Sequence, residues 1–512
     1  MTIKPTIMKY LKDKDLIYKI ISLSILLCII FFVLPEMAWA RPGGGHSYSG
    51  GSGSGGGGGG GGDAGMIIYL LLSLPPEISI PLVIIILVFY WMSKRRKQSN
   101  NQSVSSVPTY QNKSNELHQI ESKIENLKKS DPNFSRVLFL DFVTSMYYKY
   151  YSNFSKKEFK DLKPFLADDV YQNAAKVPPY SRSIDEIVIG NINLVSIYES
   201  NVALTITADI NSNYTLNMGG RNTRFVLTER WTFSRKKGLL SKGPEQMRDL
   251  KCPNCGAPSN FSDAGQCSYC ETFIQSGEMQ WSVVQINIQK QETFTAQGLG
   301  YYAQEIGTNY PTIVQPAINA HINKFIANHH LSDWNTYWAS FTDNIAVKYF
   351  NEMYKAWSEV KWEKVRHLLA DRLYDSYNFW IETYKSQGLR NKLEKINIQR
   401  IDMAAVEVDQ YYESFTVRIF ASCFDYTEST SGKLIGGSKN QARLFSEYWT
   451  FIRRTGVEKS ESNFSLNNCP NCGAPADKMG QAAVCEYCNT KISNGDFSWV
   501  LARIVQDEEY TG

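Results

Sequence analysis

Histidine is scarce in this chain, and the numbers of basic and acidic residues are nearly equal. Only six of the 512 residues are histidine, and none stands at a spacing that suggests a metal site or a general base. They are His46, His118, His321, His329, His330 and His367. Lysine and arginine number 54 against 50 acidic residues. The net charge of +4 is too small to indicate a nucleic-acid partner. The basic residues also do not cluster into a stripe that could bind nucleic acid.

Cysteine is also sparse, but eight of the ten cysteines form two copies of one pattern. Each copy reads Cys-Pro-Asn-Cys-Gly-Ala-Pro and is followed, after a short stretch, by a Cys-x-Tyr-Cys pair. The two sets are Cys252, Cys255, Cys267 and Cys270, and Cys469, Cys472, Cys485 and Cys488. Two close thiolate pairs joined by a hairpin suit a tetrahedral zinc ion, and four sulfurs close the site, so two structural zinc ions are predicted. Disulfide bonds are the alternative, although duplicated Cys-x-x-Cys pairs suit a metal better.

The first residues have the features of a targeting segment. A lysine-rich start precedes an apolar run at 20–34, and the triplet Ala-Trp-Ala before Arg41 offers a cleavage site. Residues 1–40 are therefore predicted to be a secretory signal, with an uncleaved anchor as the alternative. Residues 41–65 hold a glycine tract that cannot form a core, and we expect a flexible tether there.

A second apolar segment, residues 66–93, is interrupted by Pro75 and Pro76 and is predicted to cross the membrane with a kink. A basic and polar linker at 94–115 follows and begins Lys-Arg-Arg-Lys. Positive charge marks the cytoplasmic side. We therefore expect a single-pass protein of the inner membrane whose bulk is cytoplasmic. That compartment is reducing, which agrees with thiolates on zinc.

The remainder of the chain is duplicated. Residues 165–171 match 368–374, residues 229–235 match 447–453, and the cysteine motifs follow in the same order. Two domains are predicted, at 116–290 with a zinc ribbon at 252–270 and at 331–508 with a zinc ribbon at 469–488, joined by a linker at 291–330.

Within each unit the hydrophobic period changes from helix to strand. Leu138, Phe142 and Met146 recur every four residues, which predicts an amphipathic helix, and a second helix is expected to end with the Ala-Asp-x-x-Tyr segment. Alternation at 186–197, 203–214 and 224–235 predicts long antiparallel strands, with one more strand after the ribbon. The expected fold is α+β, with helices on a curved antiparallel sheet and the ribbon inserted between two strands.

These motifs resemble a known family. The stretch Asp-Pro-Asn-Phe-Ser at 131–135, a long aromatic helix, the segment at 162–171 and Glu-Arg-Trp-Thr-Phe at 229–233 look like the C-terminal domain of Tim44, a mitochondrial inner-membrane import subunit. The signal, glycine tract, membrane segment and ribbons resemble bacterial relatives described as zinc-ribbon transport proteins. The resemblance implies cone-shaped domains similar to nuclear transport factor and ketosteroid isomerase. It also implies membrane association and a role in protein import or as a scaffold.

Because cone folds can host enzymes, one pair of side chains is a candidate for catalysis. Asp168 with Tyr171 could remove a proton from a bound ligand, and Asp371 with Tyr374 repeats the pair. In the alternative interpretation the aspartate starts a helical turn and the tyrosine packs in the core. We expect no catalytic residue.

Four tryptophans occupy matching positions and are expected on the concave faces of the sheets. They are Trp231, Trp281, Trp449 and Trp499. Core packing is one interpretation, and a cleft that receives a peptide or a lipid tail is the other. Two charged pairs flank matching strands and are expected to form salt bridges on one face. They are Glu229 with Arg235, and Glu447 with Arg453.

An apolar stripe of Leu117, Ile120, Ile124 and Leu127 lies on a predicted helix. It could lie on the membrane surface, pair with another helix or dock onto its own domain. Cys423 is expected to be a small buried residue of a strand.

These features predict a membrane-anchored scaffold without enzymatic activity, whose domains bind a polypeptide or lipid partner at the inner membrane in protein transport. The alternatives are an isomerase-like enzyme that uses Asp168 and Tyr171, and a protein of cell-envelope maintenance. The sequence leaves the partner and the oligomeric state open.

Overall fold

The computed structural model describes most of the chain beyond its first hundred residues. The described residues are 106–156, 158–175, 182–294, 307–457, 468–469, 471–475, 482–507 and 509–512. The predicted signal, tether and membrane segment lie outside them. Among the described helices, none is long and apolar enough to cross a membrane.

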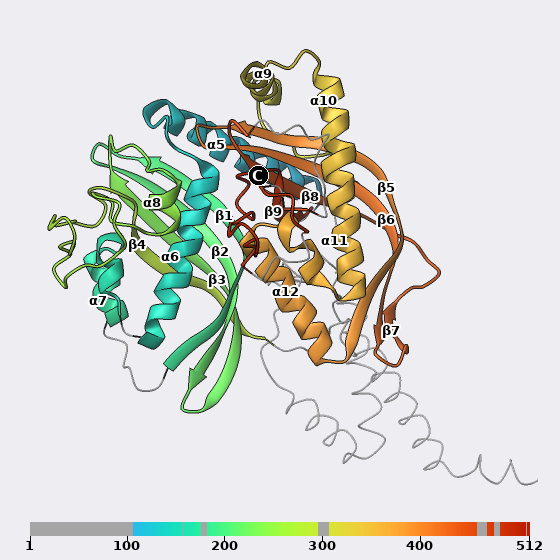
Figure 1. Ribbon diagram of the computed structural model, residues 1–512, viewed down its shortest axis with the longest axis horizontal. Coiled ribbons are helices and arrows are strands. Elements are labelled where there is room, and N and C mark those ends of the chain that lie inside the picture. The colour runs from blue at the N-terminus through green and yellow to red at the C-terminus, as the bar shows by residue number, and fades with distance from the viewer. Residues whose placement is uncertain are drawn as a thin grey trace, which may run out of the picture. The chain divides into compact units, whose positions relative to one another are not determined.

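The first half contains a four-stranded antiparallel sheet (Figure 1). Its strands are β1 Arg182–Glu199, β2 Ala203–Met218, β3 Arg221–Lys236 and β4 Ser282–Thr293, and they lie side by side in that order. The three long strands predicted from alternation are confirmed, and each extends a few residues beyond the predicted bounds. The strand expected after the ribbon is β4.

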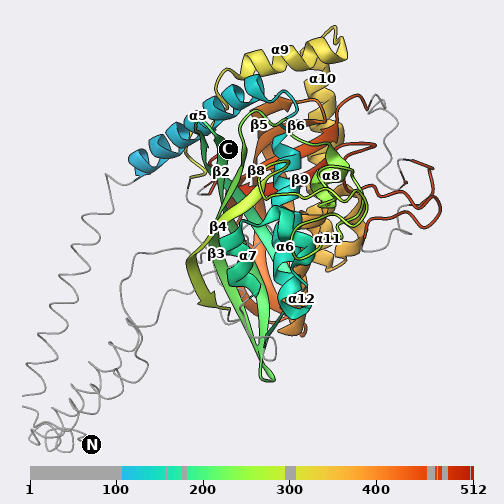
Figure 2. The ribbon, with the colours of Figure 1, turned by 90° about the vertical axis from the view of Figure 1, so that its left-hand side faces the viewer.

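Helices α6 Arg136–Lys156 and α7 Asp168–Ala175 pack on this sheet, α6 against β1 and α7 against β4 (Figures 1 and 2). The other helices of this half are α5 Ser106–Ser130 and the 3-10 helix η1 Lys160–Phe165. The prediction that a helix ends with the Ala-Asp-x-x-Tyr segment is wrong, because α7 begins there. An aspartate in a first helical turn is stabilised by the helix dipole, which favours a start at Asp168.

The second half repeats the arrangement with a second antiparallel sheet in the order β5-β6-β8-β9, with β7 paired to β6. The strands are β5 Leu389–Val408, β6 Tyr412–Ser429, β7 Leu434–Gly437, β8 Arg443–Arg454 and β9 Val500–Gln506. The helices are α9 Ile318–His329, α10 Trp334–Phe341, the π-turn η2 Thr342–Ala346, α11 Val347–Glu359, η3 Trp362–Leu368 and α12 Asp371–Ser386. The expected mixed α+β class is confirmed.

The segment predicted to be a linker at 291–330 contains a helix that belongs to the second core. Helix α9 packs on β5, and its Phe325 is fully buried against Phe415, with ring centroids 4.9 Å apart. The apolar face of α9 therefore has a partner, which explains why this part of the segment is helical and not extended.

Each cysteine motif is inserted between the last two strands of its sheet, as predicted. The first lies between β3 and β4, preceded by the short helix α8 Pro244–Arg248, and the second lies between β8 and β9.

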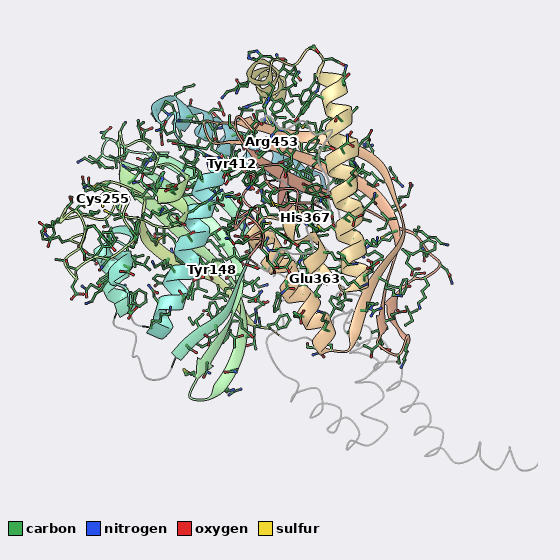
Figure 3. All side chains as sticks on the ribbon, viewed as in Figure 1. Tyr148, Cys255, Glu363, His367, Tyr412 and Arg453 are labelled. Atoms are coloured by element: carbon green, nitrogen blue, oxygen red, sulfur yellow. The ribbon has the colours of Figure 1, made fainter. Side chains whose placement is uncertain are left out.

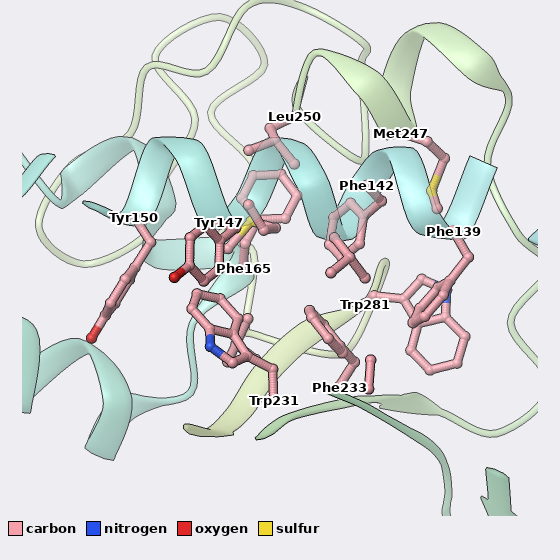
Figure 4. Close-up of a cluster of buried hydrophobic side chains, with 14 of the residues drawn as sticks. Phe139, Phe142, Tyr147, Tyr150, Phe165, Trp231, Phe233, Met247, Leu250 and Trp281 are labelled. Atoms are coloured by element: carbon pink, nitrogen blue, oxygen red, sulfur yellow. The ribbon is translucent and has the colours of Figure 1, made fainter. Parts of the chain in front are cut away.

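Aromatic side chains fill the space between helices and sheet in both halves. In the first half, Phe139 and Tyr147 of α6 face Trp231 and Phe233 of β3 (Figure 4), and the Phe139 ring lies edge-on to Phe233 at 5.5 Å. The four matching tryptophans are at most 1% exposed. Core packing is therefore the role of these tryptophans, and they do not line an open cleft.

Candidate metal centres

The first cysteine motif brings four sulfur atoms to one place. The Sγ atoms of Cys252 and Cys270 are 3.9 Å apart, and those of Cys255 and Cys267 are 4.0 Å apart. All four lie within 4.8 Å of one another. Figure 3 marks Cys255 in this ribbon, where it is exposed while Cys252 and Cys267 are buried.

The second motif has the same geometry. Its Sγ atoms are 3.9 Å apart between Cys469 and Cys488 and 3.7 Å apart between Cys472 and Cys485. The burial of the four cysteines also repeats, with the second of each motif exposed and the first and third buried.

These distances fit a tetrahedral metal site. Four sulfurs bound to zinc at about 2.3 Å in tetrahedral geometry are separated from one another by about 3.8 Å. A disulfide bond would instead hold two sulfurs at about 2.05 Å. Each group can therefore hold a metal ion such as zinc, and four sulfurs would leave no coordination position for a water molecule.

Hydrogen bonds around the sulfurs are repeated atom for atom. The amide nitrogen of Asn254 lies 3.5 Å from the Sγ of Cys270 and donates to the hydroxyl of Thr272 at 2.9 Å. Asn471 makes the same two contacts with Cys488 and Thr490 in the second ribbon. The identical Asn in both Cys-Pro-Asn-Cys motifs was a sequence signal for this role, and we did not predict it.

These contacts favour the thiolate form of the fourth cysteine in each ribbon. In the first ribbon, hydrogen bonds from Asn254 and then Thr272 lower the pKa of the Cys270 thiol to about 6. In the second, Thr490 and then Asn471 lower the pKa of Cys488 to about 6. A thiolate is the form of cysteine that binds a metal ion.

The turn that contains the first cysteine pair of each ribbon ends in a left-handed backbone conformation. Gly256 and Gly473, which follow the second cysteine of each ribbon, have φ of 75° and 78°. Their amides donate to the carbonyl oxygens of Cys252 and Cys469, both at 2.9 Å. This conformation is the reason for the glycine after each second cysteine.

Comparison with known families applies to the second half. The sequence model of the Tim44-like domain family matches residues 332–469, from the start of α10 to the first cysteine of the second ribbon. This part of the chain is similar to Tim44-like domains. No curated protein matches the chain. The resemblance read from the sequence is therefore shown for the second half, and the match ends where the second ribbon begins.

The candidate catalytic pair in the first half does not form an enclosed site. The carboxylate of Asp168 is 84% exposed and pairs with Lys163 at 2.5 Å. Lys163 also lies over the ring of Tyr171, 4.5 Å from its centroid. Asp168 thus starts a helix and Tyr171 packs beside it, as the alternative interpretation expected.

The equivalent aspartate of the Tim44-like domain holds the second ribbon in place. Asp371 accepts a hydrogen bond from Ser493 at 2.7 Å and pairs with Lys491 and Arg366. Burial alone would raise the pKa of Asp371, but Arg366 and Lys491 outweigh it and lower the pKa. Tyr374 is buried.

The predicted salt bridges between Glu229 and Arg235 and between Glu447 and Arg453 are wrong. Glu229 instead accepts hydrogen bonds from Tyr147, at 2.6 Å, and from Tyr151. Arg235 pairs with Asp131, and both side chains are 2% exposed. Two aromatic residues, Trp231 and Phe233, separate the charged ends of this face.

The second half repeats this separation with different partners. Glu447 accepts from Tyr354 at 2.9 Å, from the indole of Trp449 at 2.9 Å and from Gln506 at 3.0 Å. Arg453 pairs with Glu413 at 2.8 Å.

The apolar stripe on α5 is covered by the protein itself. Leu117, Ile124 and Leu127 are at most 3% exposed, and Ile120 packs against the core of the first half. Of the three interpretations, docking onto its own chain is therefore confirmed. Cys423 is buried in β6, as expected.

Proposed function

We propose that this protein is a membrane-associated scaffold in protein transport, with two zinc ribbons that fix the surfaces it offers to a protein partner. The Tim44-like domain at 332–469 supports this class of function. The proposed location is the inner membrane, with the described domains on the cytoplasmic side, where thiols stay reduced.

The observation that carries the proposal is the filled interior of both domains. Cone-fold enzymes bind substrate between helices and sheet, but here Trp231, Trp281, Trp449 and Trp499 occupy that space and are at most 1% exposed. A partner must therefore bind on the outside of the domains.

The ribbons supply matching outer surfaces. Tyr269 and Tyr487 stand between the second pair of cysteines in the two ribbons, and they are 61% and 62% exposed. Phe273 in the first ribbon is also 62% exposed. Exposed aromatic side chains at equivalent places of two metal-fixed turns are typical of contact residues in protein interfaces.

Two linked surfaces also bind more tightly than one. If both ribbons contact one partner, the second ribbon binds while the first already holds the partner nearby. The affinity gained then depends on the length and stiffness of the chain between the two ribbons. Zinc would fix the turn that presents each tyrosine, and the zinc ions would take no part in a reaction.

The experiment replaces Tyr269 or Tyr487 by a photo-crosslinking phenylalanine in the full-length chain and irradiates native membranes. Both positions should form crosslinks to the same protein, identified by mass spectrometry. Tyr198, which is 66% exposed on β1, is the control and should form fewer crosslinks to that protein. Equal yields at all three positions would contradict the proposal.

The second candidate is an isomerase-like enzyme that uses Asp168. Its exposed carboxylate gives this candidate little support. Turnover of a carbonyl substrate that is lost in Asp168→Asn, with zinc content and folding unchanged, would favour the enzyme over the scaffold.

A further inference from the structure

A cavity of about 980 Å³ lies between α6, α12 and the strands of the second sheet. Its wall includes three arginines from separate elements, Arg136 of α6, Arg372 of α12 and Arg503 of β9, together with the hydroxyl-bearing Ser145 of α6. This volume is that of a site for a small molecule.

Carboxylates neutralise four of the cations around this cavity. Arg136 pairs with Glu121 and with Glu407. Arg248 pairs with Asp141 at 2.7 Å. Lys491 pairs with Asp371 at 2.5 Å, and Arg454 pairs with Asp496 at 3.5 Å.

Arg372 differs from these cations. Its Nη1 atom is buried and has no hydrogen-bond partner among the described residues. Burial lowers the pKa of Arg372, and the charge of Asp141 opposes this shift, but the Asp141 carboxylate is already hydrogen-bonded to Arg248. A buried N–H group that has lost water without gaining an acceptor is costly to the folded chain.

Arg503 adds a second positive charge to the same wall. It donates to the side-chain oxygens of Asn191 at 3.0 Å and Asn193 at 2.7 Å, and to an oxygen of Gly512 at 2.8 Å. Burial, together with the nearby Arg372 and Arg136, lowers the pKa of Arg503 to about 10.

We propose that this cavity binds a small ligand that carries a phosphate group, and that Arg372 is its main anchor. A planar guanidinium with free N–H groups matches phosphate oxygens in a two-pronged contact. Arg503 adds positive charge, and Ser145 offers a hydroxyl from the facing helix. The first half has Asp169 at the position of Arg372, so the site belongs to the second half alone. This ligand is separate from the protein partner proposed above.

The test uses the purified full-length chain in detergent with three variants. Arg372→Met removes the charge, Arg372→Lys keeps the charge without the planar fork, and Arg390→Met removes an exposed arginine outside the cavity. The probes are radiolabelled inorganic phosphate and the water-soluble lipid dihexanoyl phosphatidylglycerol, both in equilibrium dialysis. Zinc content confirms that each variant is folded.

Wild type and Arg390→Met should bind a probe saturably. Arg372→Met should bind it at least about tenfold more weakly, with Arg372→Lys in between. Binding of inorganic phosphate indicates a soluble ligand, and binding of the lipid alone indicates a headgroup. The proposal is overturned if neither probe binds, or if Arg372→Met binds as wild type does.

A second measurement separates binding from a structural role. Without ligand, Arg372→Met should melt at a higher temperature than wild type, because the variant no longer buries an unpaired charge. Phosphate should raise the melting temperature of wild type and leave that of Arg372→Met unchanged. A lower melting temperature for Arg372→Met without ligand would show that Arg372 stabilises the fold and would contradict the proposal.

Discussion

At the scale of single residues, each domain buries one glutamate beneath its main helix and satisfies it with aromatic donors. Glu229 is held by two tyrosines of α6, and Glu447 by Tyr354 and Trp449. Neither glutamate is paired with the arginine of its own strand. The two halves thus keep the same carboxylate in the same place while changing the donors.

The carboxylate of Glu229 makes the stability of the first domain depend on pH. Burial raises the pKa of Glu229, and hydrogen bonds from Tyr147 and Tyr151 oppose the rise. A carboxyl group whose pKa is higher in the folded than in the unfolded protein stabilises the fold at pH values below the pKa of the unfolded state. This contribution is lost as the pH rises through the pKa of the folded state.

We therefore expect Glu229→Gln to gain stability relative to wild type as the pH rises above about 4.5. The measurement is the free energy of unfolding by urea at several pH values. Glu292→Gln, at an exposed position of β4, should follow the wild-type curve. A constant difference between Glu229→Gln and wild type at all pH values would show that Glu229 does not titrate as described.

The asparagine in each Cys-Pro-Asn-Cys motif should control how firmly the metal is held. Asn254→Ala or Asn471→Ala removes a hydrogen bond to the fourth sulfur of its ribbon, and we expect zinc affinity to fall by roughly 10- to 100-fold. Competition with a coloured chelator measures this affinity. Asn222→Ala, in the exposed β2–β3 hairpin, should release zinc like the wild type, and equal release by all three variants would contradict the role.

The sequence predicted residue roles well where the pattern was local. All eight sulfurs converge as spacing indicated, because each motif closes through its own turns. The partners of Glu229 could not be predicted in this way, since Tyr147 and Tyr151 are 82 and 78 residues away along the chain. Spacing along β3 pointed to Arg235, but the helix packed above the strand supplied the donors.

At the scale of elements, the two ribbons are embedded differently. Cys252 and Cys267 belong to the core of the first domain, together with Phe261 and Ile274. The second ribbon instead forms a small cluster of its own around Cys469, Cys485 and Ile492. The first ribbon is therefore part of the core of its domain, whereas the second ribbon has a small core of its own.

Loss of one cysteine should consequently have unequal effects. We expect Cys267→Ser to lower the free energy of unfolding of its domain by several kcal/mol, because a structural zinc ion contributes directly to folding. Cys485→Ser should unfold the second ribbon and leave its sheet intact. Hydrogen exchange followed by mass spectrometry distinguishes the two outcomes, and equal loss of protection in both sheets would contradict the difference.

Strands were easier to predict than connections. Long alternating runs predicted β1, β2 and β3, and the burial of β2 and β3 alternates accordingly along much of each strand. The segment that contains α9 lacked a strong pattern of its own, and its helix is stabilised by the contact of Phe325 with the second sheet. Such a contact depends on residues far away along the chain, so it leaves little trace in the local sequence.

At the scale of the whole molecule, the two halves are joined through buried charges. Glu407 of β5 lies 3.0 Å from Arg136 of α6 and 3.4 Å from Lys128 of α5. The side chains of all three are at most 16% exposed. Burial would raise the pKa of Glu407, but Arg136 and Lys128 lower it.

Replacing Glu407 by alanine should weaken the contact between the halves. Two cations would lose a buried carboxylate, which costs about 3 kcal/mol. We expect the thermal unfolding of Glu407→Ala to separate into two transitions. Glu199→Ala, which removes an exposed pair with Lys237, should cost about 0.5 kcal/mol or less and keep the wild-type profile. A single unchanged transition in Glu407→Ala would refute the role of this contact.

The metal content of the purified full-length chain, measured by elemental mass spectrometry, tests directly whether both ribbons hold zinc. We expect two zinc ions per chain in the wild type, one in either Cys267→Ser or Cys485→Ser, and none in the double variant. Wild-type protein without zinc when purified under reducing conditions, or two zinc ions retained in the double variant, would contradict it.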